Sequence, residues 1–235
     1  MNHPELSRFA AARLLDVRPA ADEQALLDVE PPPGFLEGHT RPGQFCKIRV
    51  GDAEGIFAMM SAPGEGPRFL VRIGNPDGGE AADALAAMTP GSAIEVSLPA
   101  GPGFPLERAR GKDVRFVATG TGVAPVCAAI EQVLAERDAY GEVSLDLGLK
   151  SPAHMAIATE IERWRRLGVE VRVAYSRVDA EGQLEGTTVQ ESLRSAHPDL
   201  AGAVVVAVGQ NAMIATLRAV VAQSHGDPDA ILTNL

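Results

Sequence analysis

Two glycines follow an apolar run near the middle of the chain, in the segment FVATGTGVAP from Phe116 to Pro125. Gly120 and Gly122 carry no side chain, so the backbone there can approach a phosphate or a ring closely. The helical segment that follows offers free amide groups to an anion. Pro125 takes the third position of the dinucleotide fingerprint Gly-x-Gly-x-x-Gly and suits a first helical turn. On its own, the motif is compatible with a nucleotide site and with an ordinary tight turn.

The histidines and cysteines do not point to another kind of chemistry. The five histidines show neither metal-ligand spacing nor a Ser-His-Asp order, so we expect them at the surface. Cys46 and Cys127 lie far apart in sequence, which excludes a disulfide framework or a four-thiolate iron-sulfur site within the chain. Each is expected to be a small buried apolar residue. The sequence therefore predicts no metal site.

The composition is that of an acidic globular protein. The 235 residues include 31 acidic and 21 basic ones, and the formal net charge of -10 disfavours nucleic acid and anionic membranes as partners. Hydrophobic residues make up 46% of the chain, which is enough for sizeable cores. The N-terminus does not resemble a secretory signal, and no run approaches the roughly 20 apolar residues of a spanning helix. We therefore expect a cytoplasmic protein.

The first part of the chain, residues 1–109, has the pattern of an antiparallel β-structure. Short apolar or alternating runs are separated by turns rich in glycine and proline, such as PPPG, RPGQ and TPGS. Strands at this spacing are typical of a sandwich or barrel, and one alanine-rich helical segment at residues 79–88 interrupts them. The predicted strands are residues 25–30, 45–50, 55–60, 68–74 and 93–98.

From residue 110 onward the pattern changes to alternating strands and helices. Nearly continuous apolar strands with helices between them predict a parallel sheet that is covered on both faces. We therefore expect a second domain at residues 110–235, whose strands are residues 114–119, 143–149, 169–175 and 203–208. Ligands of such sheets bind beyond the carboxyl ends of the strands, where the strand order reverses, and the glycine turn follows the first strand.

The chain as a whole resembles the ferredoxin-NADP reductase-like flavoprotein superfamily. The resemblance implies an N-terminal antiparallel β-barrel that binds FAD, followed by an α/β domain with a parallel sheet that binds NAD(P). It is similar to the small, divergent members without a fused iron-sulfur or haem domain. The segments that carry the resemblance, in the family's order, are RPGQF, FAMMSAP, GNPDGGEAADAL, LPAGPGF, GTGVAP, LGLK, YSR, VGQNAMI and ILTNL, the last as a short final strand.

The flavin strand that the resemblance implies departs from the family's Arg-x-Tyr-Ser. The matching positions are Gly55, Ile56, Phe57 and Ala58, so a cation and a hydroxyl are missing, although Phe57 can offer an aromatic face. A plain core strand is an equal interpretation of these residues. The residues implied to contact the flavin here are Phe57, Ala58, Met59, Met60 and Ser61.

The pyrophosphate loop that the resemblance implies is unusually acidic. Asp77, Glu80 and Asp83 surround it and repel a bound pyrophosphate, so Arg72 or Lys47 from neighbouring strands would have to compensate. The residues implied to hold the pyrophosphate are Gly78, Gly79, Glu80, Ala81 and Ala82.

The nucleotide half matches the family more closely. Lys150, Ser176 and Arg177 stand at strand ends where the family binds the adenosine ribose, and two cations suit a 2'-phosphate, which favours NADPH over NADH. They are also compatible with ordinary exposed charges. Where the family often has Cys-Gly-Pro, this chain has Val208, Gly209 and Gln210. The residues implied to bind nucleotide are Gly120, Thr121, Gly122, Val123, Ala124, Pro125, Lys150, Ser176, Arg177, Gly209, Gln210, Asn211 and Met213.

The resemblance implies an NAD(P)H-dependent flavoprotein oxidoreductase. Hydride passes from NADPH, or NADH, to FAD, and electrons then pass to a separate protein, quinone or small molecule. No catalytic side chain is required, because the cofactors supply the chemistry and the protein supplies orientation. Two alternatives stay open: a non-catalytic or regulatory module with weakened flavin binding, and a flavin reductase that uses flavin as a substrate.

Overall fold

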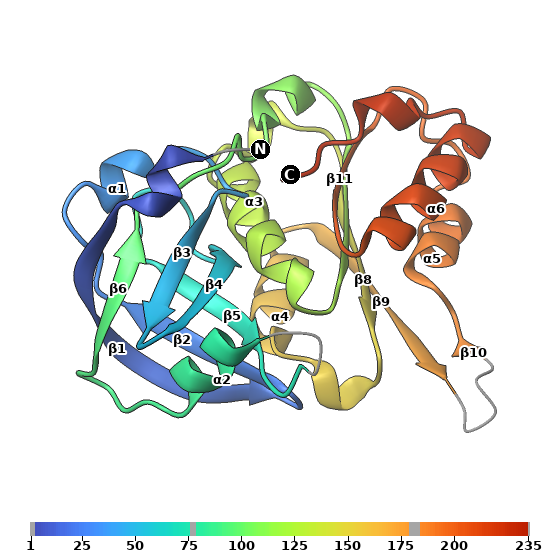
Figure 1. Ribbon diagram of the computed structural model, residues 1–235. Helices are drawn as coiled ribbons and strands as arrows, with labels where there is room; N and C mark the ends of the chain where they lie inside the picture. The colour runs from blue at the N-terminus through green and yellow to red at the C-terminus, as the bar shows by residue number, and fades with distance from the viewer. Residues whose placement is uncertain (1–2, 76–78, 179–183, 235) are drawn as a thin grey trace.

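The computed structural model describes residues 3–75, 79–178 and 184–234, and it contains two β-sheets that follow one another along the chain (Figure 1). The strands of the first sheet are β1 (Phe9–Ala21), β2 (Gln24–Val29), β3 (Phe45–Val50), β4 (Ala53–Ala58), β5 (Arg68–Arg72) and β6 (Ala93–Ser97). They pair in the order β4-β3-β6-β1-β2-β5, and every pair is antiparallel. The predicted antiparallel N-terminal architecture is confirmed.

Alternating apolar residues give this sheet a buried inner face. Leu27 and Ile48 are completely buried there, as is Phe69 on β5. Two short helices, α1 (Phe35–Gly38) and α2 (Glu80–Ala86), add Phe35 and Leu85 to the same core. The helical segment predicted from the alanine-rich sequence is therefore present as α2.

The predicted strands do not include β1, the longest strand of the sheet. Its sequence FAAARLLDVRPAA mixes alanine, charge and a proline, so it carries little strand propensity. Nevertheless β1 pairs with both β2 and β6, and its register shifts beside Asp16 and Pro19. Neighbouring strands supply the hydrogen-bond partners that decide its conformation, and the irregularities bend it.

The second sheet is built from β7 (Val114–Thr119), β8 (Val143–Leu149), β9 (Val169–Val178), β10 (Leu184–Gly186) and β11 (Val204–Val208). Its order is β10-β9-β8-β7-β11, with β10 antiparallel at the edge and the other four strands parallel. The chain runs from β7 to β9 in one direction and then places β11 on the other side of β7. The strand order therefore reverses at β7, the strand that precedes the glycine turn.

Helices cover both faces of the parallel sheet, as predicted. The helices are α3 (Val123–Ala135), α4 (Ala158–Arg166), α5 (Val189–Ala196) and α6 (Asn211–Gln223). Figure 1 shows α3 and α4 between the two sheets, with α5 and α6 on the outer face. Met60 and Leu70 of the first domain join the core that α3 and α4 form with the sheet, so an apolar interface connects the two domains.

Three predictions, on the cysteines, the histidines and the C-terminal segment, can be compared with the structure. Cys46 and Cys127 are both free and buried, as predicted. The prediction of surface histidines is wrong for His39 and His197, which are only 2% and 8% exposed. The predicted final strand at ILTNL is reduced to an isolated parallel bridge between Leu232 and Val206. None of the helices in the described residues is long and apolar enough to cross a membrane.

Candidate functional site

The glycine turn lies where the buried strand β7 leaves the sheet. Gly120 has φ +52°, in the left-handed region that favours glycine, and it begins a 3₁₀ turn that leads into α3. At Gly122 a β-carbon would lie 3.1 Å from the carbonyl oxygen of Val208, which is closer than side chains normally approach. The turn therefore presents bare backbone beside the end of β11.

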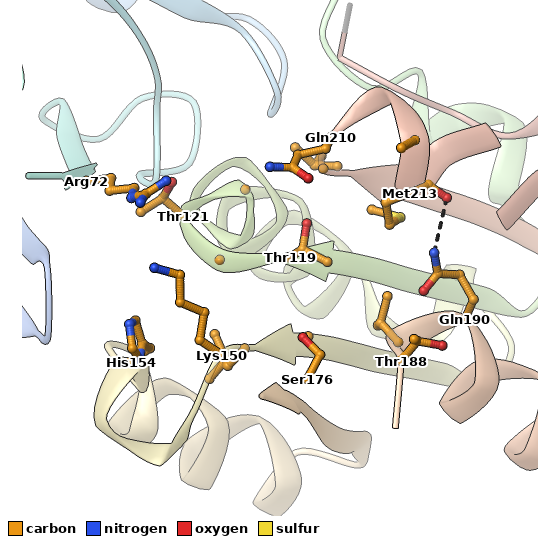
Figure 2. Close-up of a pocket in the computed structure, with 18 of the residues that line it drawn as sticks. Arg72, Thr119, Thr121, Lys150, His154, Ser176, Thr188, Gln190, Gln210 and Met213 are labelled. Carbon is orange, nitrogen blue, oxygen red and sulfur yellow. Dashed lines mark hydrogen bonds between the residues drawn. The ribbon is translucent and has the colours of Figure 1, made fainter. Parts of the chain in front are cut away.

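A cleft of about 720 Å³, here called the crevice, opens at the carboxyl ends of the parallel strands (Figure 2). The glycine turn forms one side of it, and Gly209 lies where β11 ends. A β-carbon on Gly209 would come within 2.5 Å of the hydroxyl oxygen of Thr119, so this position also requires a missing side chain. The two glycine positions keep the crevice open at the point where the strand order reverses.

Polar side chains line the far wall of the crevice. Thr188 begins α5 with a reciprocal capping box, in which its hydroxyl accepts from the Glu191 amide. Gln190 donates from Nε2 to the carbonyl oxygen of Met213, which ties α5 to α6 beside the crevice. Figure 2 shows Thr188, Gln190 and Ser176 along this wall, with neutral hydrogen-bonding groups suited to sugar hydroxyls.

A buried polar network holds α5 against the sheet beneath this wall. Asp146 of β8 accepts from Arg172 Nε at 2.9 Å and Nη2 at 2.7 Å, and from the Ser192 hydroxyl at 2.6 Å. His197 Nε2 lies 2.6 Å from Arg172 Nη2 and 3.2 Å from the Ser144 hydroxyl. Burial and the neighbouring guanidinium groups lower the pKa of His197, which keeps it neutral as an acceptor.

Charged side chains from both domains meet at the other end of the crevice. Lys150 follows β8 and donates from Nζ to Glu23 Oε2 at 3.0 Å. Arg72 of β5 lies 3.6 Å from the same oxygen. Figure 2 shows Lys150 extending toward Arg72 and Thr121. Two cations and one carboxylate give this end a positive balance beside the glycine turn, which suits phosphate groups.

A smaller cavity of about 290 Å³, here called the slot, lies between the first sheet and the glycine turn. Its walls are mainly apolar and come from β4, β5 and the start of α3, including Phe57, Leu70 and Pro125. The Phe57 ring lies over Gly55 and packs edge-on against Phe69, with 6.4 Å between the ring centroids. The slot and the crevice share four lining residues, Arg72, Thr121, Gly122 and Val208.

Comparison with known proteins agrees with this arrangement. Residues 116–219 match the family described as the oxidoreductase NAD-binding domain. The solved ferredoxin NADP+ reductase of Neisseria gonorrhoeae with bound FAD and NADP has the same fold, with a TM-score of 0.77 and 18% identity over 96% of this chain and 97% of that one. The chain therefore has the two-domain fold of this reductase, and residues 116–219 match an oxidoreductase NAD-binding domain.

Two curated proteins are similar in sequence to this chain. Reductase component 2 of terephthalate 1,2-dioxygenase from Comamonas sp is 23% identical over 219 residues, which are 92% of this chain. The chain spans only 64% of the length of that relative. The electron transfer subunit of dihydroorotate dehydrogenase B (NAD(+)) from Shouchella clausii (strain KSM-K16) is 35% identical over 102 residues, covering 40% of this chain and 38% of the relative.

Most residues that the superfamily resemblance assigns to nucleotide line one of the two cavities. In the crevice these are Gly120, Thr121, Gly122, Lys150, Ser176, Gly209, Gln210 and Met213, and in the slot they include Ala124 and Pro125. Val123 is instead buried in the core beneath the turn, and Asn211 begins α6 outside the lining. Arg177 lies in β9, but its side chain is outside the described residues.

The predicted flavin residues are divided between the slot and other surroundings. Phe57, Ala58, Gly79 and Ala82 line the slot. Met59 is completely buried and Met60 nearly so, while Ser61 lines a separate cleft on the α4 side of the domain interface. Ala81 is buried, Glu80 is exposed and Gly78 lies outside the described residues. The side chains of residues 59–61 therefore do not line the slot, and the strand ends at Ala58 rather than at the predicted residue 60.

Of the two cations considered as compensation for the acidic pyrophosphate loop, only Arg72 lines the slot among the residues that the structure describes. Arg72 lines both cavities, whereas Lys47 donates to Glu54 Oε2 at 3.0 Å and does not line the slot. Asp83 accepts from the amide of Gly74 at 2.7 Å, so one of the acidic residues stabilises the loop itself.

The crevice also contains residues that the sequence prediction missed. Glu23 and Gln24 come from the hairpin between β1 and β2, far from the glycine turn in sequence, and no local pattern marks them. Thr188 could have been predicted from the sequence. Thr-x-x-Glu is the pattern of a capping box, which indicates that a helix begins directly after Thr188.

Proposed function

We propose that this protein is an NAD(P)H-dependent flavoprotein reductase, in which a nicotinamide nucleotide occupies the crevice and a flavin ring occupies the slot. Electrons then pass from the flavin to a separate acceptor. The names of the curated relatives, a dioxygenase reductase component and an electron transfer subunit, support this class of reaction. They leave the acceptor of this chain open to experiment.

One observation carries the proposal: the crevice and the slot meet at the same turn. Thr121, Gly122 and Val208 line both cavities. A ring bound at the inner end of the crevice therefore lies against a ring bound in the slot, with bare backbone of Gly122 at their junction. Reactions between two bound rings gain most of their rate from such proximity and alignment.

The chain's own residues position and shield the two rings. When bound, the nicotinamide supplies a hydride that the flavin ring accepts, and this step needs no protein acid or base. Phe57, Leu70 and Pro125 present apolar surface to one ring in the slot and exclude water from it. Gly122 and Gly209 let the other ring approach without steric obstruction.

The residues of the slot suit a planar ring, and we infer that the cation of Arg72 would bind a phosphate of FAD. The cavity volume of about 290 Å³ and its mainly apolar walls suit a ring system. Arg72 lines both the slot and the crevice, and its five N–H donors would serve a phosphate of FAD as well as one of the nucleotide, whereas Gly55 supplies no cation. FAD is thus the proposed flavin, with Arg72 taking over the role of the missing arginine.

NADPH is the proposed nucleotide in preference to NADH. Ser176 at the end of β9 lines the crevice, and the next residue in sequence is Arg177. A guanidinium at this strand end pairs with a 2'-phosphate, whereas a carboxylate would bond the free ribose hydroxyl of NADH. The support for this preference is the residue type and its place in the strand.

The colour and reducibility of the purified protein test the proposed function. We expect stoichiometric flavin with visible absorbance, and anaerobic NADPH should bleach that absorbance in a single turnover. A colourless protein that FAD titration cannot saturate would refute the role of the slot.

A flavin reductase is the second candidate, because the first turn of α2 carries acidic Glu80 and Asp83 beside the slot. These carboxylates weaken the binding of a pyrophosphate. In that case the flavin dissociates after each turnover, and gel filtration separates it from the protein while added flavin is still reduced. Retention of flavin through gel filtration would exclude this candidate.

A further inference from the structure

The hairpin between β1 and β2 crosses from the first domain into the second. At its tip the amide of Asp22 donates to the carbonyl oxygen of Ala153 at 2.9 Å, and Gln24 Nε2 donates to the carbonyl oxygen of His154 at 3.1 Å. Glu23 lies between them with φ +55°, a left-handed conformation that is uncommon for a residue other than glycine. Its carbonyl oxygen also accepts from the amide of Ile73 at 3.0 Å, so the backbone of Glu23 is held on two sides.

This anchored backbone places the Glu23 carboxylate at the positive end of the crevice. Its Oε2 atom lies 3.0 Å from Lys150 Nζ and 3.6 Å from Arg72 Nη2, so a single carboxylate faces one cation from each domain. All three side chains remain about half exposed and therefore accessible to a ligand. The hydrogen bond from Lys150 lowers the pKa of Glu23, and the carboxylate is thus charged at neutral pH.

Lys150 and Arg72 keep donors that the carboxylate does not use. An ammonium has three N–H donors and a guanidinium five, whereas among the described residues the Glu23 carboxylate accepts a hydrogen bond from Lys150 alone. A phosphate group that enters the crevice finds the same two cations within reach. It must either displace the carboxylate or bind beside a like charge, and both cost binding free energy.

We propose that Glu23 is a resident anion that competes with a phosphate of the bound nucleotide for Lys150 and Arg72, and so sets the nucleotide affinity of the crevice. The inference rests on the proposed nucleotide site and adds to it a residue that weakens binding. That phosphate is either in the diphosphate bridge or the 2'-monophosphate of NADPH. Because the hairpin joins the domains, a phosphate that releases Lys150 also removes one interdomain ion pair.

The test is Glu23→Gln, which keeps the shape and a hydrogen-bond acceptor and removes the charge. We expect NADPH to bind to this variant about threefold to fivefold more tightly than to the unchanged protein. The affinity of the variant should also depend more steeply on salt concentration. In a Lys150→Met background the same substitution should change affinity much less. Glu107→Gln is the matched control, since Glu107 forms an exposed ion pair with Arg41 outside both cavities, and it should not affect binding.

Inorganic pyrophosphate and adenosine 2'-monophosphate, used as probes in calorimetric titrations, identify the phosphate concerned. The probe that gains affinity in Glu23→Gln is the one whose phosphate meets the two cations. Unchanged or weaker binding of both probes and of NADPH in a variant with unaltered thermal stability would overturn the proposal. If the probes bind Glu23→Gln more tightly but NADPH never reduces flavin in this protein, the reductase function is refuted. The role of Glu23 as a competitor for phosphate would then still stand.

Discussion

Gly122 lies against the end of β11 so closely that a β-carbon on it would be 3.1 Å from the carbonyl oxygen of Val208 and 3.2 Å from its Cγ1 atom. Both residues line the crevice and the slot. The backbone of Gly122 and the end of β11 therefore form a thin wall between the sites of the two proposed ligands.

Gly122→Val should weaken nucleotide binding while the protein stays folded. The added methyl groups meet Val208 or project into the crevice, so the KM for nucleotide should rise by at least tenfold, equivalent to about 1.4 kcal/mol. Gly66→Val is the control, because Gly66 has open space around it. Nucleotide titration together with circular dichroism checks both variants, and undiminished turnover in Gly122→Val would contradict the site.

Arg177→Ala should discriminate between the two nucleotides. We expect the KM for NADPH to rise by about tenfold or more, since a bidentate pair with the 2'-phosphate is lost, while the KM for NADH changes little. Arg166→Ala, on the exposed surface of α4, serves as the control for the loss of one positive charge. Equal effects on both nucleotides would refute the 2'-phosphate assignment.

Asp146→Asn should destabilise the second domain strongly. The carboxylate is completely buried and accepts two hydrogen bonds from Arg172, so its neutralisation leaves the guanidinium paired with the exposed carboxylate of Glu170, at a cost of about 3 kcal/mol. Urea denaturation measures the change in the free energy of unfolding. The exposed pair of Arg41 and Glu107 provides the comparison, because Glu107→Gln should cost less than about 1 kcal/mol. A similar small cost for Asp146→Asn would mean that the network does not hold α5.

Stability should fall as the pH is lowered from about 6.5 toward 4, and His39 should account for part of the loss. Burial lowers the pKa of His39 to about 4, and neither ring nitrogen has a hydrogen-bond partner in the described structure. As the pH falls, His39 is therefore protonated in the unfolded chain before it is protonated in the folded protein. This difference lowers the free energy of unfolding by about 1.4 kcal/mol per pH unit between pH 6.5 and 4.

The substitution His39→Met isolates that contribution from the acidic residues that also titrate. The variant should lose less stability than the unchanged protein between pH 6.5 and 4. The exposed His225 offers a matched substitution, His225→Met, that should leave the pH dependence as it was. Parallel stability curves for all three proteins would show that His39 does not titrate in this range.

Local sequence was sufficient for the parts of the fold that depend on periodicity. The parallel strands and the helices after them were predictable from apolar runs, and the glycine turn from Gly120 and Gly122. Strand β1 was not, because its propensity is weak and its partners β2 and β6 decide its conformation. The buried His39 and His197 were missed for a related reason, since burial of a polar ring depends on packing that no local pattern encodes.

The site was predictable in its backbone and less so in its side chains. Gly122 and Gly209 could be predicted from their motifs, because a side chain at either turn would meet neighbouring atoms. Glu23 and Arg72 reach the crevice from the other domain, and only the tertiary structure brings them to Lys150. Side chains 59–61 were assigned from their order in the motif, but the strand ends at Ala58 and their surroundings change.

The wall shared by the two cavities has a practical consequence for redesign. Substitutions at Thr121, Gly122 or Val208 act on both cavities at once, so a library built there would change the proposed nucleotide site and the proposed flavin site together. Ser176, Thr188 and Gln190 line the crevice alone. Directed evolution toward an unnatural nicotinamide analogue should therefore diversify these distal positions and leave the common wall untouched.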